Sequence, residues 1–155
     1  VENTLAENNE RGSDIRAREI RKQTVQRDDL VLDEIEYDSS MSREVFLQYI
    51  TEDRSIAGFL RLSLPHRDQE PITPELADAA MIREVHVYGQ AVSIGDTAEG
   101  RTQHLGLGTA LIERAVDLAT QAGYSQLAVI SAIGTREYYR KRGFADGILY
   151  QIRDL

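Results

Sequence analysis

Two glycines separated by a single residue precede a long amphipathic segment, in the stretch Gln103-His104-Leu105-Gly106-Leu107-Gly108-Thr109. Because glycine has no side chain, the backbone N–H groups of such a turn can approach a diphosphate closely. The residues that follow predict a helix over 105–122, with one apolar face formed by Leu107, Leu111, Ala115 and Leu118. The positive end of that helix would attract the same anion, so the spacing predicts a phosphate-binding loop.

Other kinds of glycine loop fit this stretch less well. A nucleoside-triphosphate loop requires a lysine and then a serine or threonine after its last glycine, whereas Thr109 and Ala110 follow Gly108. A dinucleotide-binding loop requires a third small residue, and Leu111 stands at that position. The alternative to a phosphate loop is a tight turn that lets the helix pack closely and binds no ligand.

A pair of tyrosines forms the second candidate site, in Tyr138-Tyr139-Arg140-Lys141-Arg142-Gly143-Phe144, about thirty residues after the glycines. A tyrosine hydroxyl close to a reacting atom can act as a general acid, which makes Tyr138 and Tyr139 catalytic candidates. The same pattern also fits an ordinary amphipathic helix with two half-buried tyrosines.

The strand predicted over 81–88 carries the remaining candidates. Strict alternation places Ile82, Glu84, His86 and Tyr88 on one side and Arg83, Val85 and Val87 on the other. Glu84 is a candidate general base and His86 a second one. An ion pair between Glu84 and an arginine is the structural alternative. No histidines and carboxylates have the spacing of metal ligands, so no metal site is predicted.

The elements that must position these residues follow from hydrophobic patterning. Residues 30–37, 45–50 and 56–64 predict three strands of an antiparallel meander, followed by a possible helical turn over 75–79. The strand over 81–88, the helix and a strand over 127–133 predict a right-handed crossover. A short helix over 136–142, capped by Thr135, leads to a last strand over 148–152. The fold class is α/β (α+β), with a mixed, mostly antiparallel sheet and a strand–helix–strand crossover.

Composition limits the classes of function. The 155 residues include no cysteine, which excludes a disulfide, a thiolate metal site, an iron–sulfur cluster and a cysteine nucleophile within this chain. No apolar run approaches the roughly 20 residues that span a bilayer, and the polar opening is not a signal peptide, so we expect no membrane contact and a cytoplasmic protein. A net charge of −8 disfavours binding of nucleic acid by most of the surface.

Basic residues gather near the amino terminus instead. The segment 14–27 carries five of them: Arg16, Arg18, Arg21, Lys22 and Arg27. It predicts either a solvated helix or a basic arm for a partner. We therefore divide the chain into residues 1–27, a disordered lead-in followed by this arm, and a compact domain over residues 28–155.

The Q-x-x-G-x-G loop and the Y-x-x-x-G-F segment together resemble the GNAT acetyltransferase superfamily. The resemblance implies the GNAT fold and acetyl-CoA as the cofactor, with its diphosphate on the glycine loop and its pantetheine arm along the strand at Glu84 to Val87. Tyr139 would lie near the cofactor sulfur and protonate the departing thiolate. The implied cofactor-binding residues are Glu84, Val85, His86, Val87, Gln103, His104, Leu105, Gly106, Leu107, Gly108, Thr109 and Tyr139.

Three stretches resemble one branch of that superfamily, the acetyltransferase domain of the elongator catalytic subunit: residues 83–89, 103–108 and 128–144. This resemblance implies that the acetyl group is used in the modification of the tRNA wobble uridine. The tRNA would bind through the basic arm or through a radical-SAM domain. The chain departs from that family in having no cysteine, including at Ala17, where the family commonly carries one. Either an excised domain or a stand-alone relative fits these departures.

Two other functions remain open at this point. One is a stand-alone N-acetyltransferase that acts on an amine of a protein or small molecule. The other is a non-catalytic acetyl-CoA sensor that uses the cofactor cleft alone.

Overall fold

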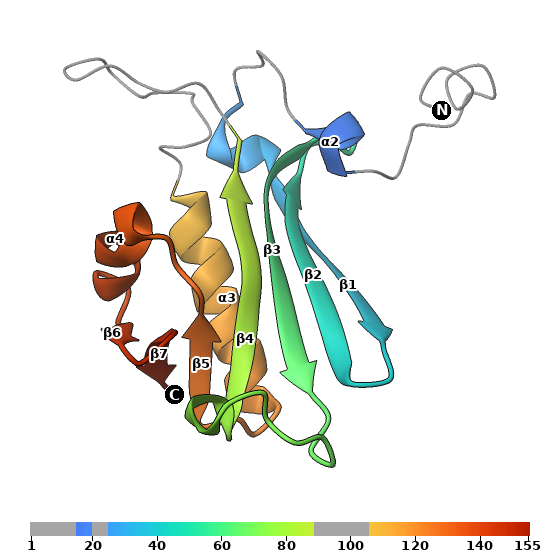
Figure 1. Ribbon diagram of the computed structural model, residues 1–155. Coiled ribbons are helices and arrows are strands. Elements are labelled where there is room, and N and C mark those ends of the chain that lie inside the picture. The colour runs from blue at the N-terminus through green and yellow to red at the C-terminus, as the bar shows by residue number, and fades with distance from the viewer. Residues whose placement is uncertain (1–14, 20–24, 89–105) are drawn as a thin grey trace.

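A single seven-stranded sheet forms the centre of the molecule, with the long helix α3 packed on one face (Figure 1). The computed structural model describes residues 15–19, 25–88 and 106–155. Neighbouring strands follow the order β1-β2-β3-β4-β5-β7-β6, in which only the pairing of β4 with β5 is parallel. The predicted mixed, mostly antiparallel sheet with one crossover is thus confirmed.

The strands are β1 (Val31–Asp38), β2 (Ser42–Ile50), β3 (Ile56–Pro65), β4 (Ala79–Val87), β5 (Gln126–Val129), β6 (Ala145–Asp146) and β7 (Gln151–Asp154). The α-helices are α2 (Ile15–Arg18), α3 (Leu107–Gln121) and α4 (Arg136–Arg140). One-turn 3₁₀ helices occupy Arg27–Asp29, Pro74–Leu76 and Ile133–Thr135. Among the described residues, no helix has the length and apolar content needed to span a bilayer.

The main core lies between α3 and the sheet. Leu47, Leu60 and Ile82 of the strands and Leu111 and Ile112 of the helix are all fully buried there. Alternation along each strand sends these side chains towards α3 and their neighbours to the opposite face. The predicted apolar stripe of the helix is therefore what fixes α3 to the sheet.

A smaller apolar cluster lies on the opposite face of the sheet, where Ile50, Ile56 and Phe59 pack together. Ile15 of α2 packs against this cluster, so the described part of the basic arm lies on the sheet (Figure 1). Arg18 donates hydrogen bonds to the carbonyl of Arg54 and to Oε1 of the fully buried Gln48, the latter at 3.0 Å. The division of the chain at residue 28 stays a prediction, but at least one arginine of the arm is engaged within the domain.

The strand predicted over 127–133 is too long at its carboxyl end. β5 ends at Val129, and the side chains of Ile130 and Ile133 are 63% and 84% exposed. The apolar run continues in the sequence, but its second half is not covered by other elements. The chain instead continues as a 3₁₀ turn followed by α4. Thr135 occupies the N-cap position of α4 as predicted, but its Oγ1 donates to the carbonyl of Ala132 and makes no capping hydrogen bond.

The last strand also begins later than predicted, at Gln151 and not at residue 148. The carboxylate of Glu75 accepts hydrogen bonds from the backbone N–H groups of Ile148, Leu149 and Tyr150. These backbone groups are therefore held in a loop by a side chain from a distant part of the chain. A local apolar pattern cannot reveal such a contact.

We predict that Leu111→Ala lowers the free energy of unfolding by about 2–5 kcal/mol, because it leaves a cavity between α3 and the sheet. Urea denaturation of the purified chain measures this difference. Asp117→Ala, on the exposed side of the same helix, is the matched control and should change stability by less than about 0.5 kcal/mol. Equal effects of the two variants would show that packing of Leu111 between α3 and the sheet does not stabilise the domain.

Candidate functional site

The sheet opens where β4 continues beyond β5. The two strands pair only from Ala79 to Ile82 on β4 and from Gln126 to Val129 on β5. Beyond that point the edge of β4 that faced β5 has no strand beside it among the described residues. Figure 1 shows α4 and the first turn of α3 at this end of the sheet, level with the carboxyl-terminal half of β4.

A cavity of about 470 Å³ lies in this opening. Strand β4 contributes Val85 and Val87, and the start of α3 contributes Gly106, Gly108 and Thr109. The remaining side is formed by residues in and around α4: Thr135, Tyr138, Tyr139 and Arg142. Three motifs that are far apart in the sequence therefore meet around one cavity.

A bulge in β4 decides which of its side chains face this cavity. Leu62 of β3 pairs with Ile82 but the preceding Arg61 pairs with Glu84, so Arg83 is an extra residue in β4. Such a bulge reverses the alternation beyond it. Ile82, Val85 and Val87 consequently all face α3. The prediction that Ile82 shares a face with Glu84 is wrong for this reason.

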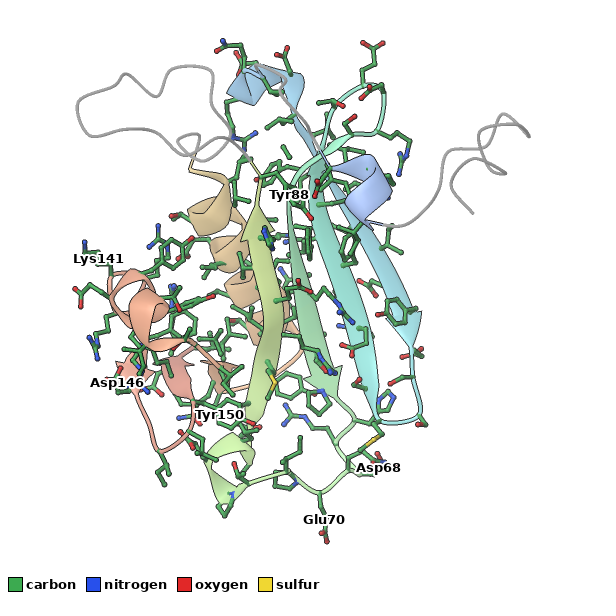
Figure 2. The ribbon with its side chains drawn as sticks, turned by 45° about the horizontal axis from the view of Figure 1, so that its top comes forward. Asp68, Glu70, Tyr88, Lys141, Asp146 and Tyr150 are labelled. Carbon is green, nitrogen blue, oxygen red and sulfur yellow. The ribbon has the colours of Figure 1, made fainter. Side chains whose placement is uncertain are left out.

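Glu84 and His86 have their side chains on the opposite face of the sheet. Glu84 Oε2 lies 3.6 Å from Nη1 of Arg61, in an ion pair between two half-exposed side chains. The ring of His86 stacks on that of Tyr88, with 4.9 Å between centroids, and more distantly on Phe59 (Figure 2 labels Tyr88 at the end of β4). Neither side chain lines the cavity, so only the backbone of Glu84 and His86 is available on that side.

The start of α3 has the backbone geometry that an anion site requires. Gly106 adopts a left-handed conformation, with φ +71°, and the helix begins at the next residue. The first N–H groups of a helix have no partner within it, and no acidic residue occupies the first turn here. These N–H groups point out of the positive end of a 15-residue helix. Gln103, His104 and Leu105, the other predicted loop residues, lie outside the described residues.

Gly108 is required by a close approach of two segments. A Cβ atom at this position would collide with the hydroxyl of Tyr138 and lie 3.7 Å from Cγ2 of Val87. The space above Gly108 is thus shared by the end of a tyrosine and the wall of the cavity. Close packing alone would also require a glycine here. Gly108 by itself therefore fits both a phosphate-binding loop and a tight turn that binds no ligand.

The two tyrosines occupy different environments. Tyr139 is 9% exposed, and its ring meets those of Tyr138 and Phe144 edge-on, at centroid distances of 5.3 and 5.6 Å. Burial raises the pKa of Tyr139, and Tyr138 raises it further, while Arg142 acts in the opposite direction. Burial likewise raises the pKa of Tyr138, against the charge of Arg142. Both phenols are therefore protonated, and can donate a hydrogen bond, at neutral pH.

Two residues of the cavity wall, Thr135 and Arg142, are not among the site residues predicted from the sequence. Arg142 follows Tyr139 by three residues and Tyr138 by four, and side chains at this spacing share one face of a helix. That spacing was a usable signal for Arg142. No group of three or more histidines and carboxylates that could hold a metal ion occurs among the described residues.

Comparison with known proteins identifies the class to which this fold and site belong. No protein-family model matches the chain. It is 35% identical over 112 residues to the tRNA uridine(34) acetyltransferase of Dehalococcoides mccartyi. This match covers 71% of this chain and 24% of that protein. It is 36% identical over 140 residues to Elongator complex protein 3 of Drosophila melanogaster, and this match covers 84% of this chain and 25% of that protein. The chain thus spans about a quarter of the length of these curated relatives.

Solved structures agree in fold. Elp3 of the archaeon Methanocaldococcus infernus matches with a TM-score of 0.82 and 26% identity, over 99% of this chain and 38% of the other. A Pyrococcus furiosus protein described as an acetyl transferase matches with a TM-score of 0.53 and 18% identity, over 71% of this chain and 64% of the other, which concerns the fold alone. The chain belongs to the GNAT acetyltransferases. Within that class it is a domain close to that of Elp3.

We predict that Gly108→Arg weakens acetyl-CoA binding by roughly tenfold or more, because the new side chain would fill the cavity and displace Tyr138. Isothermal titration calorimetry measures the affinity, and circular dichroism verifies the fold. Gly134→Arg is the matched control, because it adds the same charge where a Cβ would meet nothing within 4 Å. A folded Gly108→Arg protein that binds acetyl-CoA like the control would show that the cavity is not the cofactor site.

Proposed function

We propose that this chain binds acetyl-CoA in the cavity between β4, the start of α3 and α4, and donates its acetyl group in the modification of a tRNA wobble uridine. The observation that carries this proposal is the meeting of the glycine turn, the opened edge of β4 and the tyrosine pair around one cavity. The relatives named tRNA uridine(34) acetyltransferase and Elongator complex protein 3 supply the substrate class.

Each side of the cavity has a distinct role in this proposal. The N–H groups at the start of α3 hold the diphosphate, since a helix amino terminus favours an anion. The free edge of β4 beyond Ile82 offers backbone donors and acceptors to the amide groups of an extended pantetheine arm, much as a neighbouring strand would use them. One N–H of this edge, between Glu84 and Val87, would polarise the thioester carbonyl.

Tyr139 is the proposed general acid, with Tyr138 beside it as a second candidate. A cysteine thiol has a pKa of about 8.5, below the ordinary tyrosine value of about 10 that burial raises further here. Complete proton transfer from Tyr139 to a thiolate is therefore uphill. The role that the site supports is a hydrogen bond from the phenol to the sulfur as negative charge develops there, with the departing thiolate then taking its proton from solvent.

No carboxylate or histidine is found among the described residues that line the cavity. Glu84, the candidate base, is paired with Arg61 on the other face of the sheet, where the ring of His86 stacks on that of Tyr88. If either residue acts as a base, the acceptor must approach from that face. This observation also favours a second candidate function, a sensor that binds acetyl-CoA without transferring its acetyl group to an amine.

The proposal is tested first by binding and then by turnover. Thermal stabilisation of the chain by millimolar acetyl-CoA is the expected first result, and its absence would contradict every form of the proposal. Acetyl-CoA hydrolysis is then measured with and without tRNA. Stimulation by tRNA supports the elongator-type function, turnover only with an amine acceptor supports a stand-alone N-acetyltransferase, and binding without any turnover supports the sensor.

We predict that Tyr139→Phe lowers turnover about 10- to 100-fold while acetyl-CoA affinity changes less than about threefold, because the ring remains and only the hydroxyl is lost. Stopped assays of free CoA release measure the rate, and calorimetry measures the affinity. A collapse of binding in a folded Tyr139→Phe protein would assign the hydroxyl to cofactor binding or packing.

The same residue predicts a pH dependence. Because burial raises the pKa of Tyr139, its phenol keeps its proton at any pH below the ordinary tyrosine value. Turnover that needs this proton should persist through neutral pH and fall only above about pH 10. The pH profile of Tyr139→Phe should lack this alkaline limb. An alkaline limb of the wild type near neutral pH would point to a different titrating group.

A further inference from the structure

Arg142 places a positive charge at the wall of the cavity, and none of the carboxylates in residues 15–19, 25–88 and 106–155 is paired with it. Its guanidinium carbon lies 3.4 Å from the ring centroid of Tyr138. Its Nε donates to Thr109 Oγ1 at 3.0 Å, and its Nη1 donates to the carbonyl of Tyr138 at 2.8 Å. The side chain is therefore held between α4 and the first turn of α3 by neutral groups.

Other arginines of the domain are used differently. Among the residues that the structure describes, seven of them form ion pairs with carboxylates: Arg54, Arg61, Arg67, Arg83, Arg114, Arg140 and Arg153. Within the described part of the chain, no such pair involves Arg142. Its charge is thus available to a ligand, and a planar guanidinium that is already oriented loses little freedom on binding one.

The location of this charge is unfavourable in the free protein. Thr109 is the third residue of α3, and a cation near the positive end of a helix is repelled by the helix dipole. No acidic side chain in the first turn compensates for it. An anion bound at this end of the helix would interact favourably with both the dipole and the guanidinium.

We infer that Arg142 is a cofactor-binding residue that contacts the diphosphate of acetyl-CoA, with Tyr138 as the platform that orients its guanidinium. This inference rests on the proposed function. The two hydrogen bonds of Arg142 use two of the five N–H donors of a guanidinium, and the others are available for the oxygens of a diphosphate. Arg142 thereby adds a charged side-chain contact to the backbone N–H groups at the start of α3.

Three ligands that differ in their phosphates separate the possible roles of Arg142. Acetyl-CoA carries a diphosphate and a 3′-phosphate, acetyl-dephospho-CoA keeps only the diphosphate, and S-acetylpantetheine has neither. We expect Arg142→Gln to weaken binding of the first two ligands by the same factor, about tenfold or more, as loss of a charge-assisted contact does. Binding of S-acetylpantetheine should change by less than about twofold. Calorimetry measures the first two affinities, and ligand-observed NMR measures the third.

Lys141→Gln is the matched control, because it removes the same charge from the adjacent, exposed residue, whose side chain points away from the domain (Figure 2). It should leave all three affinities within about twofold of the wild type, because a charge exposed to solvent is largely screened. Arg142→Met keeps the aliphatic contact with Tyr138 and replaces the glutamine variant if that variant does not fold. Circular dichroism establishes folding in each case.

The outcomes distinguish this inference from the proposed function. Wild-type protein that does not bind acetyl-CoA contradicts the proposed function. Wild-type protein that binds acetyl-CoA, with a folded neutral Arg142 variant that binds it equally well, overturns only the role of Arg142. A loss seen with acetyl-CoA but not with acetyl-dephospho-CoA overturns the diphosphate assignment in favour of the 3′-phosphate. An equal loss with S-acetylpantetheine shows that Arg142 only maintains the shape of the cavity.

Discussion

The separation of β4 from β5 is the constraint on which the rest of the site depends. Parallel pairing holds the two strands together from Ala79 to Ile82 and stops where β5 ends at Val129. If β5 continued beside β4, its side chains would fill the cavity and its backbone would use the free edge. The early end of β5 also lets the chain turn towards α3, which brings Tyr139 and its neighbours to the same opening.

Burial of α3 then determines how accurately its first turn is placed. Leu107 and Leu111 are fully buried against the sheet, so the helix start cannot shift relative to β4 without disturbing the core. Gly108 lies between these two anchors and leaves room for the Tyr138 hydroxyl. The same packing that stabilises the domain therefore positions the N–H groups that would meet a diphosphate.

The two faces of β4 present different kinds of side chain, apolar residues towards the cavity and an ion pair on the opposite face. The bulge at Arg83 turns Val85 towards the cavity and leaves Glu84, with its partner Arg61, on the opposite face. The cavity wall consequently contains phenols and a guanidinium, which donate hydrogen bonds, but no described carboxylate. Such a wall suits the binding of an anionic cofactor and the stabilisation of negative charge on a leaving group. Proton abstraction from an acceptor would have to take place from the other face.

Local patterns in the sequence determined the elements and the identity of the motifs. Spacing of apolar residues identified the meander, α3 and the crossover, because those periods reflect burial on one face. The glycine turn and the tyrosine pair were likewise visible as strings of residues. Only the tertiary structure decided that β5 stops at Val129, that a bulge reverses the face of Ile82, and that Glu75 holds the loop before β7. It also placed Arg142 beside Thr109. These features depend on contacts between residues far apart in the chain, which no local period encodes.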